Sequence, residues 1–252
     1  MLSKRHEEIV RLLETAGSQT ISALAEALDV SLETIRRDVK PLEESGLLVR
    51  THGAVGLAGQ LGEAPFQRRM RENAEAKRAI ARAVAATIRD GEAVMLDTGT
   101  TTSFLARELV RHRRLTIITN SSDIARTLAT QNGNRVYMAG GELRPDNGAA
   151  FGKSVFDFVA QFIVEHVVIS AGVVDVLGIM DFDLDEAEFA RMVLSRGNRR
   201  IVVTDASKFG RRGLISVCPF GDVTHLFTNA APADDIGSAL IAAGTDLAVV
   251  GA

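Results

Sequence analysis

The stretch VSLETIRRDVKPLEESGLLVRTHG, residues 30–53, combines a helical pattern with a strand-like run. Its first half has apolar residues at spacings of three and four, the period of an amphipathic helix, at Leu32, Ile35, Val39 and Leu42. Ser31 can cap the start of this helix, and Gly46 can end it. The run 47–51 then reads as a strand, and Gly53 and Gly56 permit a tight return through Ala54 and Val55.

Two shorter helices are expected before this stretch. The first has an apolar stripe at Ile9, Leu12, Leu13 and Ala16, with Gly17 as its C-cap. The second buries Leu24, Ala25 and Leu28, and Ser22 is its expected N-cap. Three helices followed by a small hairpin predict a winged helix-turn-helix.

The third helix offers a polar face that suits DNA. At 100° per residue, Leu32, Val39 and Leu42 lie within about 60° of Ile35 and define the buried side, whereas Arg37 lies nearly opposite. Arginine matches the acceptors of guanine in the major groove, while lysine and hydroxyl groups suit phosphates. The expected DNA-binding residues are Ser31, Thr34, Arg36, Arg37 and Lys40 on the helix, with Arg50 and His52 on the wing.

Other features of the third helix have simpler explanations. A solvated surface would also explain the charged residues, since charged helix faces are common. Asp38 is expected to pair within the domain, because phosphates would repel it. Pro41 removes one backbone hydrogen bond and is expected to kink the helix.

A composition shift predicts two domains. Residues 56–65 hold three glycines and a proline, which interrupt any regular pattern. We expect a DNA-binding domain over residues 1–57, a linker over 58–65, and a second domain over 66–252, for which the family resemblance given below implies effector binding and oligomerisation.

The second domain alternates helical stretches with short apolar runs. It opens with a long amphipathic segment, about residues 66–89. The expected strands are 93–96, 115–118, 135–139, 167–170, 201–203, 225–227 and 247–250, and the expected helices between them are 103–110, 122–129, 155–162, 186–195 and 233–243. This alternation predicts an α/β fold with a mostly parallel sheet covered on both faces.

Polar loops follow several of the expected strands. Asp97-Thr98-Gly99-Thr100-Thr101 joins a strand to a helix, an arrangement that can cradle an anion, although an ordinary threonine-capped turn is the alternative. Ligands of open α/β sheets gather beyond the carboxyl ends of strands. The expected effector-binding residues are Asp97, Gly99, Thr100, Thr101, Asn120, Gly140, Gly141, Asp205 and Lys208. An aspartic protease or a P-type ATPase, both suggested by Asp-Thr-Gly-Thr, is disfavoured by the α/β setting and by Thr98 in the place of a lysine.

Composition excludes several classes of protein. Of 252 residues, 46% are hydrophobic and 24% charged, which is a globular composition, and the net charge of −3 leaves DNA contact to a local patch. One cysteine excludes an intrachain disulfide and suits the cytoplasm. The start of the chain turns acidic before any apolar run, so no signal peptide is expected, and the apolar stretch 162–180 contains three ionisable residues, so no membrane span is expected. Five scattered histidines predict no metal site, and no cofactor is expected.

The motifs also carry a family resemblance. The residues 30–39 and 42–53 resemble the signature of the DeoR family of bacterial transcription regulators, with Pro41 and Ala54 as departures. The segments LDTGTT (96–101), TN (119–120), GGELR (140–144) and DASKFG (205–210) are similar to the effector domain of that family, which resembles ribose-5-phosphate isomerase. This part of the chain also departs from the family pattern at two positions. Ala190 stands where members of the family commonly have a lysine, and Asn229 stands where they often have an aspartate.

The resemblance implies a repressor of a sugar or glycerol catabolic operon that a phosphorylated sugar or polyol releases. Residues 140–144, 157–162 and 181–183 look most like the glycerol-3-phosphate regulon repressors, which favours glycerol 3-phosphate. One winged helix buries too little surface for tight specific binding, so a homo-oligomer on double-stranded operator DNA is expected.

Two other functions remain open from the residues alone. A sugar-phosphate isomerase with a DNA-binding appendage would need a general base, for which Asp97, Asp175, Glu186 and Asp205 are candidates. Alternatively, the winged helix could be a module for binding protein.

Overall fold

A computed structural model describes residues 3–16, 19–51, 54–57, 63–211 and 213–251. The chain divides into two compact units, residues 1–68 and 69–252, and each is described here by itself. The expected linker lies largely outside the described residues, as do the expected cap Gly17 and the turn residues His52 and Gly53.

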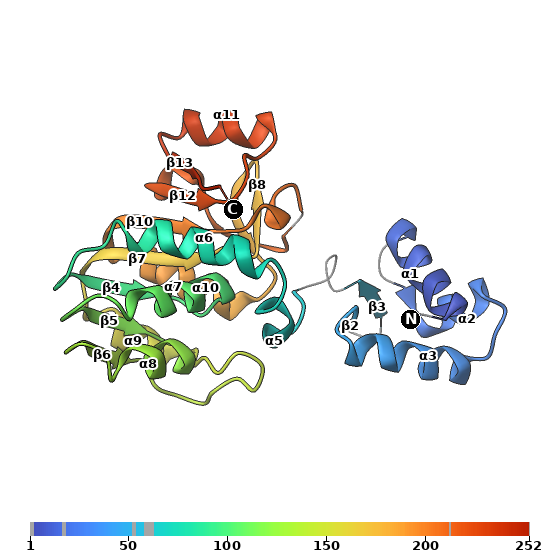
Figure 1. The fold of residues 1–252 in the computed structure, drawn as a ribbon. Coiled ribbons are helices and arrows are strands. Elements are labelled where there is room, and N and C mark those ends of the chain that lie inside the picture. Colours follow the sequence, from blue (N-terminus) through green and yellow to red (C-terminus); the bar gives the residue numbers. More distant parts are fainter. Residues whose placement is uncertain (1–2, 17–18, 52–53, 58–62, 212, 252) are drawn as a thin grey trace. The chain divides into compact units, whose positions relative to one another are not determined.

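The small unit is a winged helix (Figure 1). Its helices are α1 (Lys4–Ala16), α2 (Ile21–Ala27) and α3 (Leu32–Glu44), and the short helix α5 (Phe66–Arg69) follows the wing. The wing contains the antiparallel strands β2 (Leu48–Thr51) and β3 (Ala54–Leu57). A third strand, β1 (Gln19–Thr20), which the sequence analysis did not predict, pairs with β3, so the order of the sheet is β1-β3-β2. The core consists of Ile9, Leu13, Leu24, Ala25, Ile35, Val39, Leu42, Leu48 and Val55.

The ends of α3 are as predicted. The Ser31 hydroxyl accepts a hydrogen bond from the Thr34 amide at 3.1 Å. At the other end Gly46 has a φ of +70°, and the Leu47 amide donates to the Leu42 carbonyl at 2.9 Å. The helix is continuous through Pro41.

Two details of the predicted small unit are wrong. The N-cap of α2 is Thr20, whose hydroxyl accepts from the Ala23 amide at 3.1 Å, because the helix begins at Ile21 and so places Ser22 inside its first turn. Leu32 was expected in the core but is 45% exposed, because it lies at the edge of the apolar stripe and at the open first turn of α3.

The large unit contains a seven-stranded sheet in which every pair is parallel. The strands are β4 (Ala93–Leu96), β5 (Thr116–Thr119), β6 (Arg135–Met138), β7 (Val164–Ser170), β10 (Gly197–Val203), β12 (His225–Thr228) and β13 (Asp246–Val249). Their order is β13-β12-β10-β7-β4-β5-β6. Each overlaps one of the seven predicted strands, so the α/β prediction is confirmed.

Helices cover both faces of this sheet (Figure 1). The helices α6 (Ala74–Ala85), α7 (Thr100–Leu109) and α8 (Ser122–Leu128) supply one apolar cluster. The helices α9 (Lys153–Val159), α10 (Leu184–Leu194) and α11 (Asp234–Ala242) supply the other. In β4, Val94 and Leu96 belong to the first cluster and Met95 to the second, as the alternation of side chains along a strand requires.

Two features of the large unit differ from expectation. The segment 66–89 is not one helix, because Asn73, with a φ of +52°, separates α5 from α6. A second, antiparallel sheet of order β11-β9-β8 was not predicted; it contains β8 (Val173–Asp175), β9 (Gly178–Asp181) and β11 (Ile215–Cys218). Two short 3₁₀ helices, η1 (Ala206–Lys208) and η2 (Phe220–Asp222), follow β10 and β11.

The order of the strands places a topological switch point between β4 and β7. From β4 the chain adds β5 and β6 on one side, and then returns to add β7 on the other. Neighbouring loops diverge at such a point, which is where open α/β sheets bind ligands.

Candidate functional site

The outward face of α3 carries two arginines that the small unit does not bury. The side chain of Arg36 is 58% exposed and forms only a surface ion pair with Glu33 at 3.4 Å. Arg37 is exposed and has no hydrogen bond or ion pair with any described residue. Both guanidinium groups are therefore available to a partner outside this unit.

Asp38, between these arginines and the core, helps to hold α3 in place. It is 8% exposed and accepts a hydrogen bond from Arg5 of α1, which holds the pKa of the Asp38 carboxyl below its ordinary value. His6 lies 4.0 Å from the same carboxyl group. As expected, Asp38 pairs inside the domain and so orients the exposed side of α3.

The remaining expected DNA-binding residues differ in the contacts that they make inside the small unit. Arg50 of β2 forms two hydrogen bonds with Glu43 of α3, at 2.9 and 3.3 Å, and so links the wing to the helix. Lys40 is 75% exposed and lies 3.9 Å from Glu44. The hydroxyl groups of Ser31 and Thr34 form a hydrogen bond with each other at 2.8 Å. His52 lies outside the described residues.

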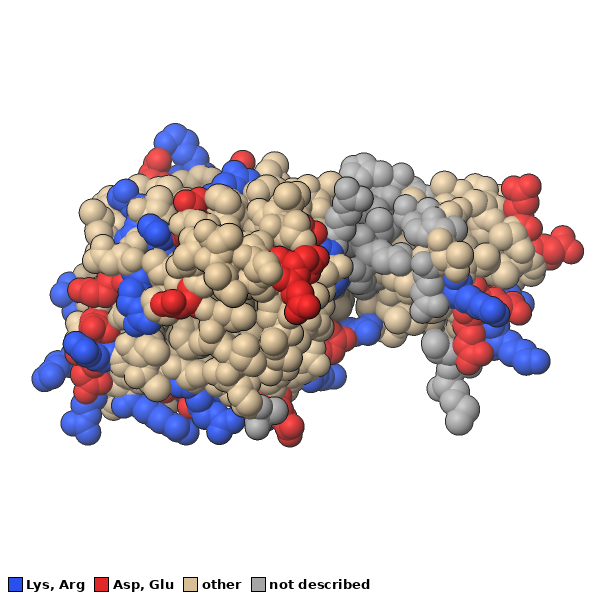
Figure 2. Space-filling model, turned by 90° about the horizontal axis from the view of Figure 1, so that it is seen from above, with Lys and Arg blue, Asp and Glu red and all other residues tan. Residues whose placement is uncertain are grey.

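In the view of Figure 2, basic and acidic side chains are interspersed over both units. This mixture matches the net charge of −3. A DNA contact of the small unit therefore depends on a few placed cations rather than on a wholly basic surface.

At the switch point, Asp97 follows β4 directly and lies beside the end of β7. Its Oδ2 accepts hydrogen bonds from the amide and the hydroxyl of Ser170, at 2.8 and 3.3 Å, whereas its buried Oδ1 has no partner among the described residues. Burial raises the pKa of this carboxyl to about 7, with the Ser170 amide opposing the shift and the charge of Asp181 adding to it.

The start of α7 adds further polar atoms that lack partners. The hydroxyls of Thr98 and Ser103 are buried and have no hydrogen-bond partner among the described residues. Thr102 instead donates to the carbonyls of Asp97 and Gly99. Gly99 is in extended backbone, but a Cβ there would lie 1.9 Å from the Ser170 hydroxyl oxygen, so the close approach of the two loops requires glycine. Buried polar groups of this kind usually form hydrogen bonds in proteins, so these hydroxyls can bind a polar ligand.

The other predicted loops lie at the same edge of the sheet. Asn120 follows β5; its Nδ2 donates to the Ala150 carbonyl at 3.0 Å, and its buried Oδ1 has no partner among the described residues. Gly140 and Gly141 follow β6 and are exposed. Asp205 follows β10 and caps η1, which ends at the partly exposed Lys208. Parallel strands bring these residues to one edge, and about 5 Å separates neighbouring strands.

Two side chains that the sequence analysis missed hold this edge together. Ser170 binds Asp97 as described, and Asn73 donates to Asp205 Oδ1 at 2.9 Å. Their signal in the sequence was weak, because serine at a strand end and asparagine at a helix start are common. Asn229, a departure from the family pattern, accepts from the Ala206 amide at 2.8 Å and so also supports η1. Ala190, the other departure in this unit, is buried in the core.

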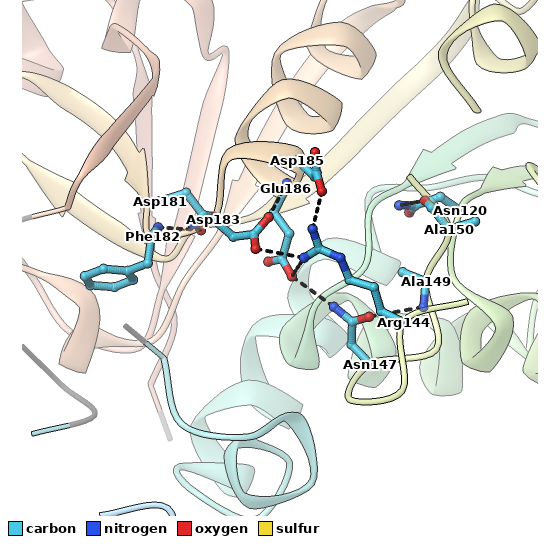
Figure 3. A network of polar contacts seen from close by, with 10 residues as sticks. All are labelled: Asn120, Arg144, Asn147, Ala149, Ala150, Asp181, Phe182, Asp183, Asp185 and Glu186. Atoms are coloured by element: carbon cyan, nitrogen blue, oxygen red, sulfur yellow. Dashed lines mark hydrogen bonds and ion pairs between the residues drawn. The ribbon is translucent and has the colours of Figure 1, made fainter. Parts of the chain in front are cut away.

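Arg144 organises a polar network beside the Asn120 loop (Figure 3). Its guanidinium bonds to Asp183 at 2.8 Å and to Asp185, and lies 3.9 Å from Glu186. The same guanidinium stacks 4.3 Å from the ring centre of Phe151. Arg144 thus ties the loop between β6 and α9 to the first turn of α10. The sequence analysis names residues 140–144, residues 181–183 and Glu186, but it does not predict that Arg144 pairs with acidic residues 39 to 42 positions away.

A cavity of about 260 Å³ lies elsewhere in the large unit. Arg191, Leu194, Ser195, Arg200, Val217, Cys218 and Asp222 line it. It contains none of the predicted site residues. Burial raises the pKa of the Cys218 thiol to about 12, as suits a packed and unreactive cysteine.

Two kinds of feature are absent from the described residues. Among the residues that the structure describes, no group of three His, Cys, Asp or Glu side chains could hold a metal ion. Likewise, the described helices include none that combines the length and the apolar character needed to cross a membrane.

Comparison with known proteins agrees with this two-part architecture. Residues 5–60 match the model of the DeoR-like helix-turn-helix domain, and residues 72–230 match that of the DeoR C terminal sensor domain. The chain is 36% identical to the HTH-type transcriptional repressor CsqR of Escherichia coli over 90% of this chain and 88% of that protein. It is 33% identical to the Glycerol-3-phosphate regulon repressor of the same organism over 91% and 92%.

A solved structure of ribose 5-phosphate isomerase A from Methanocaldococcus jannaschii is also similar in part, with 19% identity, a TM-score of 0.42 and 56% of each chain covered. That partial overlap has no bearing on function. The curated relatives named above are transcriptional repressors, which favours a regulator over an enzyme. The two matched domains and these relatives show that the chain belongs to the DeoR family of DNA-binding transcriptional regulators.

Proposed function

We propose that this protein represses an operon of sugar or glycerol catabolism by binding operator DNA through α3. A phosphorylated sugar or polyol, with glycerol 3-phosphate as the favoured compound, binds at the carboxyl edge of the parallel sheet and releases the DNA. The protein acts as a homo-oligomer on repeated half-sites, because one winged helix contacts too little DNA for tight specific binding.

The outward position of Arg36 and Arg37 is the observation that carries the DNA-binding role. The opposite side of α3 is fully buried, at Ile35 and Val39, so only the arginine side can meet a duplex. Ser31 orders the first turn, which is the part of a recognition helix that enters the major groove. Arg37, with no partner among the described residues, is the best placed to read guanine O6 and N7.

The chemistry at the switch point supports a polyol ligand. Asp97 Oδ1 and Asn120 Oδ1 are buried oxygens without partners among the described residues, and each can form a hydrogen bond with a sugar or glycerol hydroxyl group. The hydroxyls of Thr98 and Ser103 can donate to ligand oxygens. Lys208 supplies a cation for the phosphate group, two strands away from Asp97 in the sheet. The name of the 33% identical relative, the Glycerol-3-phosphate regulon repressor, supports this choice of ligand.

The DNA-binding role is tested with duplexes selected by the protein from a random library. Arg37→Ala should weaken binding to selected duplexes by about 1–3 kcal/mol while changing binding to random DNA much less. Arg11→Ala, which removes an exposed arginine from α1, is the matched control and should bind like the parent. Equal losses on selected and random DNA would show that Arg37 contacts only phosphate.

The effector role is tested by release of the protein from the same duplexes. Glycerol 3-phosphate should release the parent protein, while glycerol and inorganic phosphate should not. Lys208→Ala should keep DNA affinity but lose release, and Lys153→Ala, at an 86% exposed lysine on α9, should behave like the parent. Unchanged release from Lys208→Ala would exclude Lys208 from the site.

A further inference from the structure

Leu32 is an exposed apolar residue at the edge of the apolar stripe of α3, next to the polar face of the helix. It begins the helix, its side chain is 45% exposed, and it does not belong to the core cluster. Among the described residues of the small unit, no other leucine, isoleucine, valine, methionine or phenylalanine is exposed. Its exposure therefore does not follow from a generally open core.

The neighbours of Leu32 place it on the surface that meets DNA. Leu32, Arg36 and Lys40 follow one another at intervals of four residues, so they form one row along the helix. Arg36 and Lys40 are 58% and 75% exposed. The cap at Ser31 orders the turn that carries Leu32, which is the turn a recognition helix inserts most deeply.

The surroundings of Leu32 do not suit a protein partner. Glu33, the next residue, is 83% exposed, and the adjacent Arg36 is charged. A single leucine among charged groups makes no contiguous apolar patch of the size that protein interfaces use. In the major groove, by contrast, a single apolar side chain such as Leu32 can contact the methyl group of thymine, and the other three bases present no methyl group there.

From this position and chemistry we infer that Leu32 reads the 5-methyl group of a thymine in the operator half-site, among the base pairs that the first turns of α3 meet. The inference rests on the proposed reading of DNA by α3. Removing one methyl group from such a contact costs about fourfold in affinity, the effect of burying one carbon group. The contact involves no phosphate, so it leaves the salt dependence of binding unchanged.

The test replaces each thymine of a selected duplex, one at a time, by deoxyuridine, which keeps base pairing but lacks the methyl group. For the parent protein, one position per half-site should lose about three- to fivefold in affinity. For Leu32→Ala that position should become insensitive, because the partner of the methyl group is gone. Leu32→Met, which keeps an apolar side chain, should retain part of the sensitivity.

Two results would contradict the inference. If no thymine is sensitive in the parent, or if Leu32→Ala retains the full sensitivity, Leu32 does not read the methyl group. Equal melting temperatures of Leu32→Ala and the parent ensure that the comparison is between folded proteins. A parent that selects no sequence from the library would overturn the proposed function itself, which distinguishes the two failures.

Discussion

Replacing Asp97 by asparagine should remove the loss of stability that this carboxyl causes in the large unit as pH rises from 4 to 8. In the folded chain burial raises the pKa of this carboxyl from an ordinary 3.8 to about 7. The folded state therefore keeps a proton that the unfolded state has already released, and stability falls as pH rises through this window. The loss is absent below about pH 4 and complete above about pH 7.

The change in the free energy of unfolding follows from the difference between the folded and unfolded pKa of Asp97. A difference of about three pKa units corresponds to about 4 kcal/mol, which is an upper bound because the carboxylate can draw in water when it ionises. Asparagine does not titrate, and its side-chain oxygen can still accept from the Ser170 amide, which lies 2.8 Å from Asp97 Oδ2. The variant should thus gain stability relative to the parent as pH rises.

The assay is calorimetric melting of the full chain at pH 4.5, 6, 7 and 8. Relative to the parent, the Asp97→Asn transition should rise by on the order of 10 °C across this range. Glu142→Gln, at an exposed acid of the loop after β6, is the control and should follow the parent. Parallel curves for Asp97→Asn and the parent would refute the idea that Asp97 is protonated in the folded protein near neutral pH.

Two further changes test the contacts that shape each unit. Asp38→Ala should destabilise the small unit at pH 7, because it removes the hydrogen bond that Arg5 of α1 donates to α3. Arg5 lowers the pKa of Asp38, so the stability that this pair contributes is present above about pH 4 and is lost as pH falls further. Urea unfolding followed by circular dichroism should therefore show a smaller difference in unfolding free energy between variant and parent at pH 3 than at pH 7. Gly99→Ala should destabilise the large unit by about 1–3 kcal/mol, since its Cβ would lie 2.7 Å from the Ser170 Cβ. Adding Ser170→Gly should restore the melting temperature, and failure of this rescue would show that the cost lies in the backbone.

The parallel sheet could be predicted because its signals are local. Each strand is a short apolar run between helical stretches, and in β4 the residues Val94, Met95 and Leu96 are buried on both faces. The cap at Ser31 could likewise be predicted, because its hydrogen bond joins residues three apart in sequence. These features depend on neighbours along the chain.

The errors come from contacts or edges that periodicity does not describe. Leu32 fits the apolar stripe of α3, yet it lies at the end of the helix, where no neighbouring element covers it. Asn73 interrupts the helical pattern by adopting a positive φ, and it makes a hydrogen bond with Asp205, 132 residues away. The partners of Arg144 are about 40 residues distant. None of these pairings can be read from a sequence without its fold.

The way the small unit is held together constrains how an effector can release DNA. The described contacts that orient α3, from Arg5 to Asp38 and from Arg50 to Glu43, lie within residues 1–68. Effector binding in residues 69–252 therefore need not dismantle the recognition helix, and doing so would cost the stability of its whole core. Under the proposed function, the effector acts instead on the spacing of two such helices in the oligomer. A change in this spacing needs to supply a coupling free energy of only about 1–3 kcal/mol between the effector site and the DNA site. That is a typical allosteric value, and it changes operator affinity by roughly 5- to 150-fold.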